Sequence, residues 1–207
     1  MITKLAAELT DKTNKHLNLC EDETEVVKYG LFSILSKILY FLISVIAGCI
    51  LNCLPESCIF YFTFVCIRKH AGGYHAKSEK NCIIISVFSV LACVYTAYLC
   101  KSVFNLKVSL FLLSVISVIL IIAFSPIDTI EHPLNRKTKR KYKKITAAKA
   151  ILFLTCSFIM LLLSTYLTIA DIGNIASAVN IAIILEGVLL TMGKVKQISV
   201  KKLNPQK

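Results

Sequence analysis

Residues 31–51 read LFSILSKILYFLISVIAGCIL, and this stretch decides the class of protein. Apart from Lys37, none of these 21 residues is charged. A helix of that length spans about 30 Å at 1.5 Å per residue, which matches the hydrocarbon core of a bilayer. We therefore predict a membrane-spanning helix here, with Lys37 near enough to one end for its ammonium group to reach the interface.

The rest of the chain has the same character. Of its 207 residues, 56% are hydrophobic, and the mean hydropathy is +0.71. Soluble domains rarely exceed about half apolar residues, and here the apolar residues come in long blocks. We predict an all-α polytopic membrane protein, a single domain over 1–207, with about six transmembrane helices. After 31–51, the predicted spans are 57–67, 83–100, 106–124, 150–169 and 172–192.

The second predicted span is short. Ser57 to Ile67 is a largely apolar stretch of only 11 residues, about 16 Å as a helix, or roughly half a bilayer core. It either crosses the membrane with its polar end drawn in, or it is re-entrant. With six spans and an inner N-terminus, 21 of the 24 Lys and Arg residues fall on the cytoplasmic side. A re-entrant segment would put the basic stretch 126–149 outside, so the positive-inside rule favours a crossing.

This topology divides the chain into functional segments. We expect both termini, the 68–82 loop and the basic 125–149 loop to be cytoplasmic. The complete set of segments is 1–30 (amphipathic), 31–67 (first helical hairpin), 68–82 (loop), 83–124 (spans three and four), 125–149 (basic loop), 150–192 (spans five and six) and 193–207 (basic tail).

The N-terminal segment has its own pattern. Apolar residues recur at helical spacing through 1–19, with charged residues between them. This predicts an amphipathic helix. The helix lies either in the membrane interface or in the cytosol against the 68–82 loop, and the residues leave both arrangements open.

Cysteine content and net charge exclude two other classes. Most of the nine cysteines lie in apolar runs, and an odd number with no secretory framework argues against a disulfide scaffold. The net charge of +12 comes from cations that flank apolar segments, which is the pattern of a protein facing anionic lipid. We therefore expect membrane lipid as a partner, and no nucleic acid.

Chemistry is concentrated in one polar island. Residues 68–82 read RKHAGGYHAKSEKNC and bring together a thiol, two imidazoles, a Gly-Gly pair and several cations. We predict that Cys82 is a nucleophile and that His75 assists it. Cys82 begins an apolar span, where the positive end of a helix dipole, with Lys77 and Lys80 nearby, would favour the thiolate.

This prediction carries a geometric requirement. Seven residues of continuous helix would separate His75 from Cys82 by about 10 Å along the axis, too far for a hydrogen bond. The chain between them must therefore fold back. Gly72 and Gly73 can supply a tight turn and present N–H groups to an oxyanion. Arg68 would bind a carboxylate or orient the loop.

Other interpretations of the island stay open on the residues alone. An isolated Cys at the start of a span is usually inert, and a His in a basic loop is usually solvated. Cys66 and His70 form a second candidate pair, at i and i+4 on one helix face. A metal site from Cys66, His70, His75 and Cys82 does not match the usual zinc spacings, and we expect no metal or other cofactor.

The island resembles a known family. The matching core is Gly72-Gly73-Tyr74-His75-Ala76, with Arg68 upstream and Cys82 seven residues after His75. The basic loop also fits, opening with Ser125-Pro126-Ile127-Asp128 and continuing with Pro133-Leu134-Asn135. In these features, and over essentially its whole length, the chain resembles the AgrB family, the accessory gene regulator membrane endopeptidases of quorum sensing.

The resemblance implies a function. The substrate would be an autoinducing-peptide precursor with an amphipathic helix and an acidic C-terminal tail. Cys82 would attack the bond before the tail, His75 would assist, and an internal Cys or Ser of the substrate would then close a thiolactone or lactone. The protein would be a multi-pass thiol protease of the bacterial cell membrane.

Two features suggest further roles. The cations of the basic loop would attract either an acidic peptide tail or lipid headgroups; the candidates are Arg136, Lys137, Lys139, Arg140 and Lys141. Glu186, a carboxylate inside or at the inner end of the last span, with six spans, motivates the alternative of a peptide transporter without proteolytic chemistry. We also expect that apolar span faces permit a homodimer.

Overall fold

The computed structural model describes residues 2–17, 20–72, 79–127 and 135–203. This part of the chain confirms the all-α prediction, since it consists of helices and their connections. The helices are α1 (Ile2–Leu17), α2 (Glu21–Ile50), α3 (Leu54–Ala71), α4 (Glu79–Cys100), α5 (Phe104–Phe124), α6 (Arg136–Leu167) and α7 (Ala170–Leu203).

The chain forms two compact units, Met1–Ile43 and Ser44–Lys207. The first holds α1 and most of α2. The helix predicted near the N-terminus is present, and within it Ala6 and Thr10 are buried. An acidic stretch forms the start of α2, where Glu23 Oε2 accepts a hydrogen bond from Cys20 N at 3.2 Å. Whether α1 lies in the interface stays a prediction.

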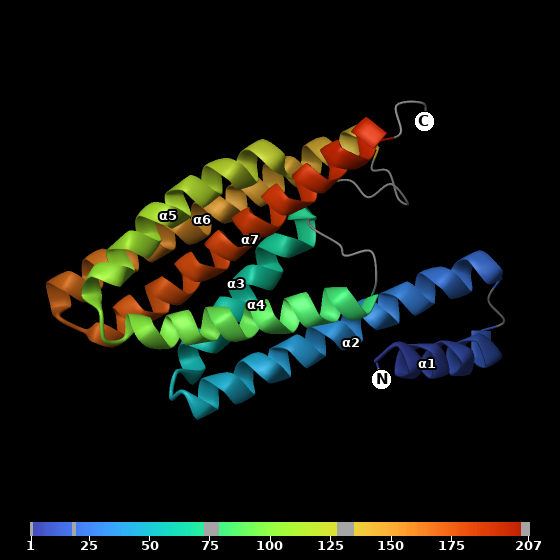
Figure 1. Cartoon of the computed structure of the whole chain (residues 1–207), viewed down its shortest axis with the longest axis horizontal. Coiled ribbons are helices and arrows are strands. Elements are labelled where there is room, and N and C mark those ends of the chain that lie inside the picture. The colour runs from blue at the N-terminus through green and yellow to red at the C-terminus, as the bar shows by residue number, and fades with distance from the viewer. Residues whose placement is uncertain (1, 18–19, 73–78, 128–134, 204–207) are drawn as a thin grey trace. The chain divides into compact units, whose positions relative to one another are not determined.

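The second unit is organised around α7. This helix packs against α3, α4, α5 and α6, and Figure 1 shows it running alongside α5 and α6. An apolar cluster joins four of these helices; its buried members are Ile67, Ala71, Val118, Ile121, Ala150, Val179, Ile183 and Leu190. The ends of α3 and α5 and the middle of α6 thus share one core with α7.

Five of the described helices are long and apolar enough to cross a membrane. They lie within α2, α4, α5, α6 and α7, so a polytopic membrane protein is confirmed. The short second span predicted over 57–67 falls in α3, which extends over 18 residues. The helix α3 includes the charged residues Glu56, Arg68 and Lys69 near its ends. Because of these charges, α3 is less apolar than the five candidate spans.

Two basic segments are helical beyond the predicted boundaries. We expected a loop over 125–149 and a span from 150, but α6 already begins at Arg136. Lys and Arg are good helix formers, and the buried positions Thr146, Ala150 and Ser157 recur at helical spacing on one face. Likewise α7 continues through the predicted basic tail as far as Leu203.

Polar side chains line the inner face of α7. Lys107 Nζ donates to Asn174 Oδ1 at 2.7 Å. The hydroxyls of Ser114 and Ser157 both donate to Asn180 Oδ1, at 3.1 and 2.8 Å. Lys107 lies in α5, within the predicted span 106–124, and is only 5% exposed. Inside an apolar bundle its ammonium group needs the amide oxygen that α7 supplies.

We expect Asn174→Leu to destabilise the protein by about 1.5–3 kcal/mol, since a buried charged donor loses its acceptor. Thermal unfolding in detergent measures the effect. The double variant Lys107→Met/Asn174→Leu should recover most of the loss, because no buried charge remains. Asn105→Leu, at an exposed position of α5, is the control. Equal stability of the Asn174→Leu and Asn105→Leu variants would contradict the role of this pair.

Candidate functional site

Cys82 lies in the first turn of α4. It is the fourth residue of that helix, and its side chain is half-buried. The first N–H groups of a helix have no partner within the helix, so this end carries partial positive charge. The predicted position of the thiol at a helix start is therefore confirmed. His75 and Gly73 lie outside the described residues, so the approach of the imidazole to the thiol stays a prediction.

Gly72 ends α3 in a conformation that favours glycine. Its φ is +73°, and a Cβ there would lie 2.7 Å from the carbonyl oxygen of Ile127. Just before it, Ala71 O accepts a hydrogen bond from Ile127 N at 3.1 Å. The connection that follows α5 therefore packs directly on the end of α3. This brings together two parts of the sequence, the glycine motif and the Ser125–Ile127 segment.

Lys149 of α6 binds the same end of α3. Its Nζ donates to Cys66 O at 2.9 Å and lies 3.3 Å from His70 Nδ1. The ring of Tyr142 meets the His70 imidazole edge to face, with 5.5 Å between centroids. Burial lowers the pKa of His70, and the cations of Lys149 and Lys69 lower it further.

These contacts bear on the two alternative interpretations of the island, the Cys66–His70 pair and the metal site. An ammonium group that donates to Nδ1 of His70 occupies the lone pair with which that nitrogen would take a proton. This weighs against His70 as the base for Cys66. Among the described residues no group of three His, Cys, Asp or Glu side chains is arranged to hold a metal ion. The proposed metal set includes His75, which lies outside that part.

Arg68 faces a buried carboxylate. Its Nη1 lies 3.5 Å from Glu186 Oε1, and the Glu186 side chain is fully buried while that of Arg68 is 23% exposed. The carboxylate thus lies inside the bundle and faces α3, and its depth in the membrane stays a prediction. The pairing also supplies a local partner for the charge that had motivated the transporter alternative.

The predicted cationic residues project from the first turns of α6. The side chains of Arg136, Lys137, Lys139, Arg140 and Lys141 are all exposed. Tyr142 and Lys149, seven residues apart on the other face, turn toward α3. The segment therefore has a packed face and a charged, exposed face, but its partner stays a prediction.

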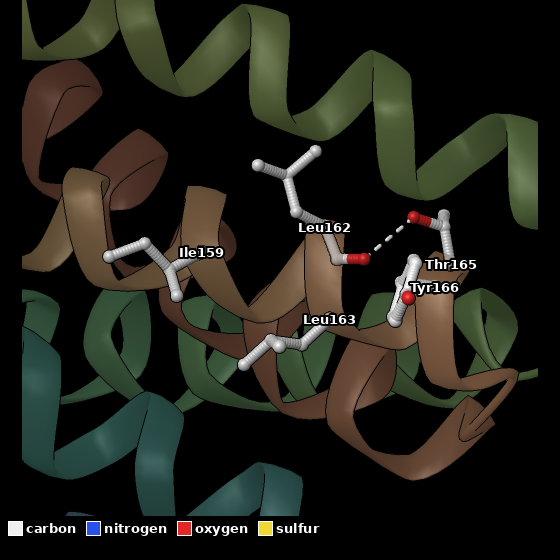
Figure 2. A pocket seen from close by; sticks show the side chains of 5 residues that line it. All are labelled: Ile159, Leu162, Leu163, Thr165 and Tyr166. Carbon is white, nitrogen blue, oxygen red and sulfur yellow. Dashed lines mark hydrogen bonds between the residues drawn. The ribbon is translucent and has the colours of Figure 1, made fainter.

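A depression on the far part of α6 is a different kind of surface. Figure 2 shows its lining residues, Ile159, Leu162, Leu163, Thr165 and Tyr166, all from one helix. The Thr165 hydroxyl is used locally, donating to Leu162 O at 2.8 Å. An open apolar surface without a nucleophile or base suits contact with lipid tails better than catalysis.

Comparison with known proteins identifies the family of this chain. A family model described as accessory gene regulator B matches residues 4–191. The chain belongs to the AgrB family. Family membership indicates a role in the processing of autoinducing peptides.

Several similar proteins are named as AgrB-like proteins. A putative AgrB-like protein of Clostridium acetobutylicum is 32% identical over 165 residues, covering 77% of this chain and 76% of the relative. Putative AgrB-like protein 2 of Clostridium perfringens is 26% identical over 158 residues (73% and 72%). One from Lactiplantibacillus plantarum is 26% identical over 167 residues (81% and 82%). No solved structure shows significant similarity to this chain.

Sequence reasoning missed three contributors to this region: Lys149, Tyr142 and Ile127. Lys149 was counted only as a loop cation. Its spacing of seven from Tyr142 would have placed both on one helix face, provided that the basic segment had been recognised as helical. The contact of Ile127 with Ala71 is tertiary, and no local pattern predicts it.

We expect Gly72→Ala to destabilise the protein by about 1–3 kcal/mol, because an alanine at positive φ is strained and its Cβ would collide with Ile127 O. Gly30→Ala is the matched control, since a Cβ at Gly30 meets nothing within 4 Å and alanine favours a helix. Thermal unfolding of both variants decides the point. Equal stability of the two would show that the turn does not need glycine.

We expect Lys149→Met to raise the pKa of His70, because a neighbouring cation is removed. In the wild type the folded-state pKa lies below the unfolded value of about 6.5, so the unfolded state binds more protons and stability falls as the pH drops through that value. The variant should lose less stability over the same range. Imidazole NMR and pH-dependent unfolding test this, with the exposed Lys144→Met as control. An unchanged His70 titration would contradict it.

Proposed function

We propose that this protein is a membrane cysteine endopeptidase that removes the C-terminal tail of an autoinducing-peptide precursor. The observation that carries the proposal is the place of Cys82 in an AgrB-family chain. The thiol lies in the first turn of α4, half-buried, and the segment that leads to it leaves α3 at Gly72. His75 falls within that segment and is the proposed general base.

The first step is acyl transfer to the enzyme. The Cys82 thiolate attacks the carbonyl carbon of the peptide bond before the tail, giving a tetrahedral oxyanion. Backbone N–H groups near Gly72 and Gly73 and those of the first turn of α4 are the proposed oxyanion donors. The C–N bond then breaks, the protonated His75 gives its proton to the leaving amine, and the precursor core stays on Cys82 as a thioester.

The second step closes the ring. His75 removes the proton from an internal Cys or Ser of the bound precursor, and the resulting nucleophile attacks the thioester carbonyl. The Cys82 thiolate leaves, and the product is a thiolactone or lactone. No water is consumed, so a half-buried thiol at a membrane protein's helix end suits the reaction, because limited water access protects the thioester from hydrolysis.

The basic start of α6 is the proposed docking surface for the acidic tail. Its exposed cations carry like charge and lie on the same helix whose Lys149 contacts the end of α3. Electrostatic attraction would bring the tail to this end of the bundle. Lipid headgroups are the competing partner. The distribution of Lys and Arg supports a cytoplasmic location for this end.

The proposed pair of Cys82 and His75 predicts which variants abolish cleavage. In cells that co-express a tagged precursor with an acidic tail and an internal Cys, we expect Cys82→Ala and His75→Ala to lower tail removal by at least about a thousandfold, since the nucleophile or its base is lost. Cys66→Ala should cleave normally.

Immunoblotting of the tail and mass spectrometry of the core measure the result. A Cys82→Ala protein that still cleaves would overturn the assignment of the nucleophile. If Cys66→Ala alone were inactive, the Cys66–His70 pair would be the true site. A cargo that moves across the membrane without any cleavage would favour the transporter.

A further inference from the structure

We propose that Glu186 is a positioning residue that acts through Arg68, holding the guanidinium so that its accessible part binds an oxygen atom of the peptide substrate. The chemical class of that ligand is a backbone carbonyl or a carboxylate. The link to substrate rests on the proposed peptidase function; the hold on Arg68 does not.

Burial of the Glu186 carboxylate inside an apolar bundle is energetically unfavourable, which points to a functional role for this group. It is fully buried, in the middle of a helix long and apolar enough to span a membrane. Among the described residues neither of its oxygens has a hydrogen-bond partner, so the 3.5 Å approach of Arg68 is a charge pairing rather than a bond. A buried ion pair whose two partners share no hydrogen bond contributes little stability and often costs some. Intramembrane charges with such partners are commonly functional.

The pair differs from the other contacts at this end of α3. Lys149 and Ile127 bind main-chain carbonyls, which fixes the path of the backbone. Glu186 instead fixes the direction of a side chain. Its partner atom, Nη1, is buried, yet the Arg68 side chain as a whole is 23% exposed. The accessible area therefore lies on other atoms of Arg68.

The location suits a contact with substrate. Arg68 is one turn before Gly72, where the chain turns away toward Cys82. A guanidinium is a planar donor that matches carbonyl and carboxylate oxygens when its orientation is fixed. Because Glu186 holds one side of the guanidinium, Arg68 loses less rotamer freedom when its exposed part meets an oxygen atom of the substrate.

The opposite end of α3 supplies a matched control. Glu56 is 4% exposed and lies 3.2 Å from Lys101. The Glu56–Lys101 pair is thus about as buried as the Glu186–Arg68 pair. Glu56 lies on the same helix as Arg68, about 18 Å from it along the axis. Glu56→Gln should therefore match Glu186→Gln in any general effect on stability, without touching Arg68.

The first measurement is independent of proteolysis. Phenylglyoxal modifies guanidinium groups, and the chain has only three, Arg68, Arg136 and Arg140. Mass spectrometry of the purified full-length protein would give the rate at Arg68 relative to the two exposed arginines. We expect Glu186→Gln to raise the relative rate at Arg68 at least about threefold, Glu186→Asp to raise it less, and Glu56→Gln to leave it unchanged. No change in Glu186→Gln overturns the proposal.

The second measurement links the pair to catalysis. Initial rates of precursor cleavage would be compared for Arg68→Gln, Glu186→Gln and the double variant. We expect each single change to lower kcat/KM by about tenfold to a hundredfold, mainly by raising KM, with partial rescue by Glu186→Asp. The double variant should be no worse than Arg68→Gln, because Glu186 acts through that residue.

The remaining outcomes separate the two proposals. Additive losses in the double variant, or an equal loss in Glu56→Gln, would overturn the positioning role. If the wild type itself cleaves no precursor, the peptidase function fails, along with the substrate role of Arg68. Phenylglyoxal would still decide whether Glu186 holds the guanidinium.

Discussion

The chain leaves the helical path at the end of α3, inside a largely apolar bundle. The geometry of the candidate site depends on how this helix end is stabilised. Backbone carbonyls at a helix end have no partner within the helix, and burying them unpaired is costly. Here Ile127 N binds Ala71 O, while Gly72 takes the positive φ that redirects the chain. Because the hydrogen bond and the glycine turn together fix the last turn of α3, the segment that leads to Cys82 starts from a defined position.

This arrangement relies on α7 as a scaffold. Without a hydrophobic drive between helices in a bilayer, small residues permit close packing and polar ones join the helices. A Cβ at Gly187 would lie 2.9 Å from the Cβ of Ser117, and one at Gly173 would lie 2.6 Å from Ser164 Oγ. Both glycines thus allow neighbouring helices to approach. Asn180, between them, accepts hydrogen bonds from α5 and α6.

The fold was largely predictable from the sequence, because span length and apolarity are properties of single segments. Pairings across helices were not. The burial of Lys107 depends on Asn174, 67 residues later, and the partner of Glu186 lies on α3. The helical start of α6 was hidden by its charge, since an unbroken basic stretch looks like a loop. The positions of Cys82 at a helix start and of Gly72 at a turn were predictable because each follows from the local sequence.

One electrostatic feature connects these parts. The last turn of α3 carries Arg68 and Lys69, and Lys149 adds a third cation. Burial lowers the pKa of His70, and the cations of Lys149 and Lys69 lower it further. Such a concentration of positive charge also favours an anion nearby, whether a thiolate, an oxyanion or an acidic peptide. The same charges would repel one another if none were compensated. The buried carboxylate of Glu186 offsets part of this repulsion from inside the bundle, which leaves the net positive charge on the outer side of the cluster.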